Sequence, residues 1–312
     1  MAEKDKVAFV FPGQGSQSVG MGKELYDQFP IAKEVFHEAE ECLGFPISEL
    51  CFSGPESDLK LTENTQPAIL TTSIAALRVL QSETSLQPDL VAGHSLGEYS
   101  ALVCAGALDF CDAVKLVRER GRLMQQAVPP GEGAMGVVLG LEPDTVQSLC
   151  AQASNGEIVS PANYNGGGQI VIAGAKNAVA RAVAAARAQG AKKVLDIPVS
   201  APFHCDLMKP AAEGLKELLA GIVVKPLAIG VVTNLEAEVN LDHNRVKALL
   251  TEQTVRPVRW EESVRKLDAL GCHRVWEVGP GKVLRGLIKR ISSSLEVENF
   301  QTPQDLERAT VA

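Results

Sequence analysis

The pentapeptide Gly93-His94-Ser95-Leu96-Gly97 places a serine between two glycines, a pattern typical of nucleophilic serine enzymes. The apolar run Leu90–Ala92 precedes it and a helical pattern follows, so Ser95 is expected at a sharp strand-to-helix turn. Unpaired N–H groups and the positive dipole end at the start of a helix favour an oxyanion. The pattern predicts Ser95 as a nucleophile and the N–H of Leu96 as an oxyanion donor. A tight turn without chemistry is the alternative.

A serine hydroxyl needs a general base, and the sequence contains five histidines. His204 is the best candidate, because it ends Pro202-Phe203-His204, where the chain returns to a larger domain, and clefts between domains are preferred ligand sites. A histidine packed in a linker is the alternative. Activity is then expected to decline at acidic pH as His204 becomes protonated. No acidic residue between Ser95 and His204 lies in an obvious loop for a catalytic triad.

Arg120 projects from the apolar stripe of a helix expected at 109–127. An unpaired guanidinium would be costly in such a place. Either a protein carboxylate pairs with it, or a ligand carboxylate does so in a bidentate contact. With a serine nucleophile in the same domain, we favour the ligand. The neighbours of Arg120 three and four positions away are Leu116, Val117, Leu123 and Met124.

The loop at residues 12–17 (Pro-Gly-Gln-Gly-Ser-Gln) is the candidate source of a second oxyanion donor. It follows the first expected strand, Val7–Phe11, and open α/β sheets bind ligands at the carboxyl ends of their strands. Ser18 stands where a dinucleotide fingerprint needs its third glycine. The Gly-Lys pairs at 22–23 and 281–282 lack the upstream glycine of a phosphate-binding loop. The alternative interpretation is that residues 12–17 form an ordinary connecting loop.

Apolar, β-rich runs alternate with helical patterns along the chain, which predicts an α/β protein. After breaker-rich residues 128–135 the order becomes β-α-β-β-α-β, which is typical of a ferredoxin-like domain. We therefore expect a small domain at 129–198, inserted in a large domain formed by 1–128 and 199–312. The small domain's expected strands are 134–141, 158–162, 169–173 and 193–197, with a turn at 163–168 and helices at 143–153 and 177–189.

The large domain is expected to contain strands and helices on both sides of the insertion, followed by a polar tail. Its expected strands are 7–11, 90–92, 229–233 and 274–278, and its expected helices are 24–43, 65–81, the run after Gly97, 109–127, 207–220, 242–251, 260–270 and 281–291.

The composition limits the class of protein. The 312 residues are 46% hydrophobic and 22% charged, with a net charge of −8 and 4% aromatics. These values exclude a disordered chain and a nucleic-acid binder. Seven cysteines, an odd number without a C-x-x-C pair, indicate neither a disulfide framework nor a zinc site, and reduced thiols fit a cytosol. No apolar run approaches the ~18 residues that span a bilayer, so we expect a cytoplasmic protein.

Four segments together resemble the malonyl-CoA:acyl-carrier-protein transacylases of bacterial fatty-acid synthesis. They are Phe11–Gln17, Gly93–Tyr99, Arg120-Gly121 and Pro202–His204, and they occur in the family's order. The resemblance runs from about residue 6 to 290 and shows no departure at a catalytic position. It implies an α/β-hydrolase-like large domain with an inserted ferredoxin-like small domain.

The resemblance also implies roles for individual residues. Ser95 would be the acylated nucleophile and His204 its base, while the backbone N–H groups of Gln14 and Leu96 would form the oxyanion hole. The backbone carbonyl of Gln253 would orient the histidine, which explains the missing acidic member of a triad.

The substrate and partners also follow from the resemblance. Arg120 would grip the malonyl carboxylate, and Phe203 matches the malonyl-selective form. Asn163 and Asn165 correspond to a cleft-lining turn in the small domain. Malonyl-CoA and an acyl carrier protein would be the partners, with no metal or redox cofactor, and a monomer is favoured.

Two alternative hypotheses, each assigning the protein to a different functional class, stay open. A serine thioesterase would release malonate, and a non-catalytic acyl-CoA-binding or carrier-binding module would not need Ser95. Carrier proteins are acidic, so docking on this acidic chain requires a local basic patch. The candidates are Arg285, Lys289 and Arg290, or Lys192-Lys193; a solvated charged face is the alternative for both.

Overall fold

Five consecutive apolar residues form β1 (Val7–Phe11), an inner strand of a six-stranded sheet, and all five are buried. Such a run is typical of a parallel strand covered on both faces. The computed structural model of the protein describes residues 6–197 and 201–310. The strand order is β10-β9-β1-β2-β7-β8, parallel except for β8. The other strands are β2 (Leu90–Gly93), β7 (Gly230–Val232), β8 (Val239–Asn240), β9 (Arg274–Val278) and β10 (Glu296–Phe300).

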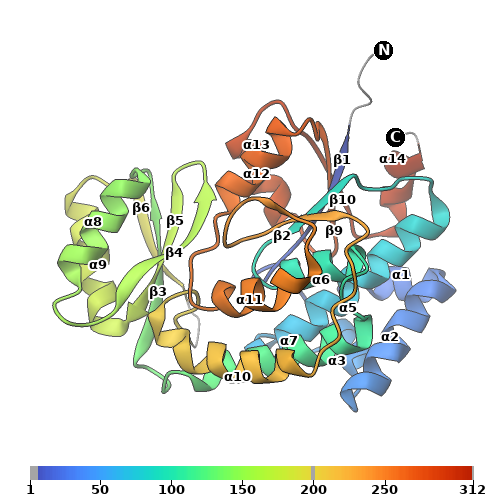
Figure 1. Ribbon diagram of the computed structural model, residues 1–312, viewed down its shortest axis with the longest axis horizontal. Coiled ribbons are helices and arrows are strands. Elements are labelled where there is room, and N and C mark those ends of the chain that lie inside the picture. The colour runs from blue at the N-terminus through green and yellow to red at the C-terminus, as the bar shows by residue number, and fades with distance from the viewer. Residues whose placement is uncertain (1–5, 198–200, 311–312) are drawn as a thin grey trace.

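Alternate residues of β1 point to opposite faces of this sheet, and each face is covered by its own helices (Figure 1). Phe9 and Phe11 pack with α2, α5 and α7, whereas Ala8 and Val10 pack with α12 and α13. The helices of this part are α1 (Lys23–Gln28), α2 (Pro30–Leu43), α3 (Ile47–Ser53), α4 (Glu56–Leu59), α5 (Thr62–Glu83), α6 (Gly97–Cys104), α7 (Phe110–Gln126), α10 (Lys209–Ala220), α11 (His243–Gln253), α12 (Trp260–Ala269), α13 (Val283–Ile291) and α14 (Leu306–Thr310).

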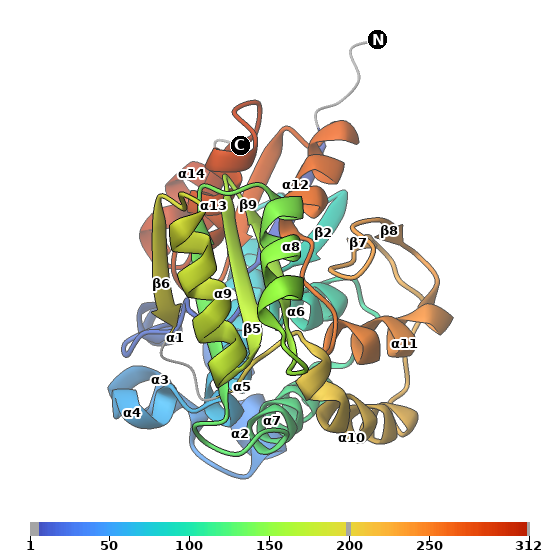
Figure 2. The ribbon, with the colours of Figure 1, turned by 90° about the vertical axis from the view of Figure 1, so that its left-hand side faces the viewer.

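A second, four-stranded antiparallel sheet forms a lobe beside the large one. Its order β4-β5-β3-β6 is that of a ferredoxin-like domain, which confirms the expected fold class. Two helices cover one face (Figure 2), and the other face packs against residues of the large part, Phe203 among them. The elements are β3 (Gly133–Leu139), α8 (Pro143–Ala153), β4 (Val159–Gly166), β5 (Gln169–Ala175), α9 (Lys176–Ala188) and β6 (Lys193–Ile197).

The expected return to the large domain at 198–199 lies outside the described residues. The division of the chain at 129 and 198 therefore stays a prediction. In the described part, every helix is too short or too polar to traverse a lipid bilayer.

Several expected elements have other bounds. The helix expected at 24–43 is two helices, because Phe29 before Pro30 is extended (φ −121°, ψ 117°), as residues before proline tend to be. The turn expected at 163–168 is wrong for Asn163 and Asn165, because β4 continues to Gly166. The expected polar tail contains β10 and α14, where Val297 and Phe300 are buried.

The cysteines also differ from expectation, because Cys42 and Cys111 form a disulfide. Packing of α2 against α7 brings the two Cα atoms to 5.6 Å, a separation that bridged cysteines usually show. The spacing of 69 residues gives no sign of this pairing in the sequence. The remaining five cysteines are free thiols.

Candidate active site

Ser95 stands at the turn between β2 and α6, in a left-handed backbone conformation with φ 51°. Both flanking glycines are required there by close approach. A Cβ at Gly93 would lie 2.0 Å from the carbonyl of Gly97, and one at Gly97 would lie 2.0 Å from the carbonyl oxygen of Phe11. The turn therefore has the tight geometry expected of a nucleophile elbow.

His204 is the histidine that contacts the serine. The Oγ of Ser95 lies 2.7 Å from Nε2 of His204, although 109 residues separate them in the sequence. Nδ1 of His204 lies 2.8 Å from the backbone carbonyl oxygen of Gln253, which can only accept a hydrogen bond. Nδ1 therefore carries the proton, and Nε2 is free to accept one from Ser95.

The electrostatics keep this imidazole neutral. His204 is 3% exposed, and burial lowers its pKa to about 3, with the positive charge of Arg120 acting in the same direction. A neutral imidazole is the form that can accept the serine proton.

Arg120 is buried directly beside the nucleophile, with 1% of its surface exposed. It donates hydrogen bonds to Oε1 of Gln66 (2.7 Å), to Oε1 of Gln253 (2.9 Å) and to Oγ of Ser95 (3.2 Å). Among residues 6–197 and 201–310, no carboxylate lies within ion-pairing distance of it. Of the two partners expected for Arg120, a protein carboxylate or a ligand carboxylate, the first is thus not found in this part of the chain. A buried cation in this state is suited to an anionic ligand.

The loop after β1 lies against the elbow. A Cβ at Gly13 would lie 2.3 Å from the carbonyl oxygen of His94, so the backbone at 13–14 passes directly beside Ser95. The backbone N–H groups of Gln14 and Leu96 have no acceptor within the described residues. Two unpaired N–H groups beside a nucleophile are the donors that an oxyanion hole needs.

The asparagines of β4 lie in the seam between the two sheets and do not touch Ser95. Oδ1 of Asn165 is 2.9 Å from Nε2 of His94, whose ring packs on Trp260 with centroids 5.6 Å apart. Asn163 is buried and forms a backbone bridge with Val258. The Asn165 contact ties the small lobe to the elbow through His94, and the Asn163 bridge ties it to Val258 of the large part.

Three further polar residues of the site are Asn234, Gln66 and Glu98, to which the sequence patterns gave no role. Oδ1 of Asn234 accepts a hydrogen bond from the backbone N–H of Ser95 (2.6 Å), and its Nδ2 donates to the carbonyl of Gly93 (2.6 Å). Gln66 contacts Arg120, and Glu98 is buried on α6. Glu98 lies within the segment Gly93–Tyr99, whereas Asn234, in an ordinary turn sequence, gives no signal.

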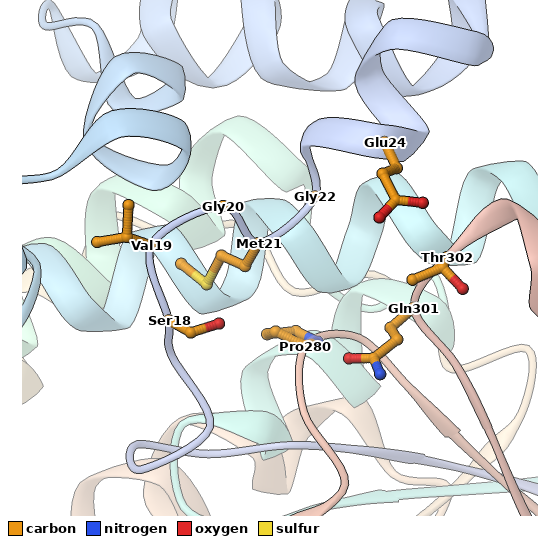
Figure 3. A pocket seen from close by; sticks show the side chains of 9 residues that line it. All are labelled: Ser18, Val19, Gly20, Met21, Gly22, Glu24, Pro280, Gln301 and Thr302. Carbon is orange, nitrogen blue, oxygen red and sulfur yellow. The ribbon is translucent and has the colours of Figure 1, made fainter.

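A cavity of about 280 Å³ opens elsewhere, between the loop at 18–22 and the segments after β9 and β10. Figure 3 shows Met21, Pro280 and Gln301 around it. Its lining includes neither Ser95 nor His204 nor Arg120, so it is separate from the site described above.

A serine activated by a neutral histidine, beside unpaired backbone donors on an α/β sheet, defines the class of serine-dependent acyl-transfer enzymes. Residues 8–311 match the acyl transferase domain family. The chain belongs to the family of malonyl CoA-acyl carrier protein transacylases, as the resemblance implied.

The relatives cover almost the whole chain. The malonyl CoA-acyl carrier protein transacylase of Escherichia coli (strain K12) is 47% identical over 302 residues, which is 97% of this chain and 98% of the relative. That of Bacillus subtilis (strain 168) is 48% identical, with 97% and 96% covered.

Two solved structures are also similar. An acyl carrier protein S-malonyltransferase from Vibrio cholerae has a TM-score of 0.96 at 48% identity, covering 98% of this chain and all of that one. A malonyl-transacylase in complex with a type II polyketide synthase acyl-carrier protein has a TM-score of 0.96 at 45% identity, covering 98% and 99%.

Proposed function

We propose that the protein transfers a malonyl group from malonyl-CoA to the phosphopantetheine thiol of an acyl carrier protein, through a malonyl ester of Ser95. The observation that carries this proposal is the contact between Arg120 and Ser95. The guanidinium lies 3.2 Å from the nucleophilic oxygen and has no carboxylate partner in the described part of the chain. The names of the relatives support the same reaction.

In the first half-reaction, Oγ of Ser95 attacks the thioester carbonyl while Nε2 of His204 takes its proton. The N–H groups of Gln14 and Leu96 stabilise the oxyanion of the tetrahedral intermediate, each by on the order of 10²-fold in rate or more. The C–S bond then breaks, His204 returns the proton to the leaving thiolate, and CoA departs. The product is malonyl-Ser95.

In the second half-reaction, the thiol of the carrier protein attacks the ester of malonyl-Ser95, and its proton passes through His204 back to Oγ of Ser95. Every step is an acyl or proton transfer performed by residues of the chain. We therefore propose that no metal or redox cofactor takes part, and, on the family resemblance, that the protein acts as a cytoplasmic monomer.

Arg120 gives the site its preference for an acyl group with a terminal carboxylate. A malonyl group can pair with the guanidinium, whereas an acetyl group leaves the buried charge unpaired. Phe203 packs in the apolar cluster that joins the small sheet to the large part, which supports its proposed position at the edge of the acyl site.

The two basic candidates for carrier docking lie on opposite sides of one glycine-rich turn. A Cβ at Gly167 would lie 2.9 Å from Cβ of Arg290, and one at Gly140, whose N–H bonds to Gly168, would lie 2.7 Å from Cγ of Lys192. This supports a single docking patch, which we define as Lys192, Lys193, Lys289 and Arg290, all exposed. Arg285 is excluded, because it donates to the carbonyl of Val297 and to Asn299.

The function is tested by mass spectrometry of the intact protein after incubation with malonyl-CoA, followed by peptide mapping. We expect one malonyl group on the peptide that contains Ser95, and its transfer to holo carrier protein with little free malonate. Ser95→Ala should abolish the adduct. An adduct elsewhere would remove Ser95 as the nucleophile, and rapid release of malonate would identify a hydrolase.

A further inference from the structure

Glu98 is a buried carboxylate next to the catalytic residues that the reaction described above does not use. It lies in the first turn of α6 and is 2% exposed. Its Oε2 accepts hydrogen bonds from Nε2 of Gln253 (2.8 Å) and from the backbone N–H of Asn234 (3.0 Å). No cation forms an ion pair with it among the described residues, so these two N–H donors are its main support.

The hydrogen bond from Nε2 of Gln253 to Glu98 fixes the orientation of the Gln253 amide. An ionised carboxylate can only accept hydrogen bonds, so the amide nitrogen of Gln253 must face Glu98. The same nitrogen donates to the carbonyl of Ser95 at 3.0 Å. Oε1 of Gln253 is therefore left to accept from Arg120, at 2.9 Å. If the amide of Gln253 were reversed, its NH2 group would face the guanidinium of Arg120. No hydrogen bond could then form, because a guanidinium contains only donors.

The second donor ties Glu98 to the elbow. Glu98 accepts a hydrogen bond from the backbone N–H of Asn234 and so fixes the position of that residue. The side chain of Asn234 in turn accepts from the N–H of Ser95 and donates to the carbonyl of Gly93, each at 2.6 Å. Ser95 has a left-handed conformation, which needs such support from its surroundings. One carboxylate thus supports both the nucleophile, through Asn234, and the malonyl-binding guanidinium, through Gln253.

We propose that Glu98 is a positioning residue of the transfer reaction, which through Gln253 and Asn234 holds Arg120 and Ser95 in their reactive geometry. This inference rests on the proposed function, because Arg120 must bind the malonyl carboxylate for its orientation to affect selectivity. The carboxylate must be ionised to act in this way. When it is protonated, the carboxyl group loses its negative charge, and the two charge-assisted hydrogen bonds that Oε2 accepts from Gln253 and Asn234 become weaker.

The surroundings of Glu98 make that protonation relevant near neutral pH. Burial raises its pKa to about 7, against the opposing effects of the two N–H donors and of Arg120 on α7. Tyr99, the next residue on α6, is also buried. Glu98 also lines a small pocket, whose other lining residues are uncharged and come from α6, β7 and the residue after it, β8 and α11, namely Leu102, Val231, Thr233, Asn240, Val246, Leu249 and Leu250.

The test compares the full-length protein with Glu98→Gln, using the rate of Ser95 acylation by malonyl-CoA and by acetyl-CoA across pH. We expect Glu98→Gln to lower kcat/KM for malonyl-CoA at least about tenfold, mainly in kcat, and to reduce the preference for malonyl over acetyl. The fall in wild-type activity below about pH 7 should be absent in the variant. Glu98→Asp keeps the charge and should retain that fall.

Glu277→Gln is the matched control. Glu277 on β9 is fully buried, accepts backbone N–H groups of Leu284 and Arg285, and also has a pKa raised to about 7 by burial. It does not contact Ser95, His204 or Arg120 in the structure. Its variant should keep the wild-type acyl preference and the acidic fall in activity, whatever its effect on stability.

A folded Glu98→Gln protein with wild-type rate, acyl preference and pH profile would overturn the proposal. If the variants do not fold, the wild-type protein decides the matter, because its preference for malonyl over acetyl should decrease as the pH falls through about 7. A constant preference across that range would overturn it equally. Failure of malonylation at Ser95 in wild-type protein would instead contradict the proposed function.

Discussion

The guanidinium of Arg120 is in direct hydrogen-bond contact with the hydroxyl of Ser95, 3.2 Å away. The group that we propose to recognise the acyl chain thus lies against the proposed nucleophilic oxygen. In the half-thioester of a three-carbon diacid, one methylene separates the carboxylate from the thioester carbonyl, so both ends can be held at once. The short separation of Arg120 and Ser95 suits a malonyl group better than a longer diacid.

We expect Arg120→Ala to reduce acylation by malonyl-CoA by about 10- to 100-fold, the range for loss of a charged hydrogen bond. Acylation by acetyl-CoA should fall less or rise, since no unpaired charge remains in the site. The measurement is kcat/KM for both thioesters. Arg122→Ala is the control, because Arg122 lies two residues further on α7 and pairs with Glu119 on the surface. An unchanged malonyl preference in Arg120→Ala would remove that residue from its proposed role.

The protonation of His204 should occur at lower pH than the sequence suggested. Its sequence gives no reason to depart from an ordinary pKa of 6.5, but burial and Arg120 lower that pKa to about 3. Between about pH 3 and 6.5, the folded protein therefore binds fewer protons at His204 than the unfolded chain does. The contribution of His204 to the free energy of unfolding consequently decreases as the pH falls through this range.

We expect the imidazole resonance of His204, followed by NMR, to stay constant from about pH 8 to about pH 5. The difference between spectra of wild-type and His204→Gln protein assigns it. A midpoint near pH 6.5 would show that His204 is not buried beside Arg120 as described. The loss of activity expected near neutral pH is then a property of Glu98, and the two measurements separate these groups.

The sequence singled out Ser95 by its glycine-flanked pentapeptide and His204 by its place where the chain returns to a larger domain. The contact of Ser95 with His204 and the carbonyl of Gln253 on Nδ1 both lie where the family resemblance implied them. Val7–Phe11 has the predicted bounds, since a continuous apolar run leaves little choice of structure. Arg274–Val278, in which Arg274 and Glu277 are charged, also has the predicted bounds.

The supporting contacts could not be predicted in the same way. Asn234 meets Ser95 across 139 positions and Gln253 meets Glu98 across 155, and no local periodicity records such distances. Asn165 looked like a turn residue because glycines follow it, yet pairing with β5 extends the strand through it. Val297 in β10 alternates with acidic residues, so an edge strand resembled a polar tail.

Charge reversal in the docking patch should weaken carrier binding and leave acylation intact. We expect Lys289→Glu/Arg290→Glu to raise the KM for holo carrier protein at least about tenfold at low salt, with a smaller effect at high salt, because exposed charges are screened. Lys23→Glu/Lys33→Glu on α1 and α2 makes the same change in net charge and should have little effect. Equal KM values for the two double variants would exclude this patch as the docking site.

The disulfide between Cys42 and Cys111 should stabilise the packing of α2 against α7, the helix that carries Arg120. Cross-links that close loops of this size contribute about 2–4 kcal/mol, so Cys42→Ser should lower the free energy of unfolding by about that amount. Cys104→Ser, at a free cysteine, is the control. Thiol titration of the denatured, unreduced protein should find five of the seven cysteines reactive. Seven reactive thiols would show that the pair is reduced, as is usual for cysteines in a cytosol.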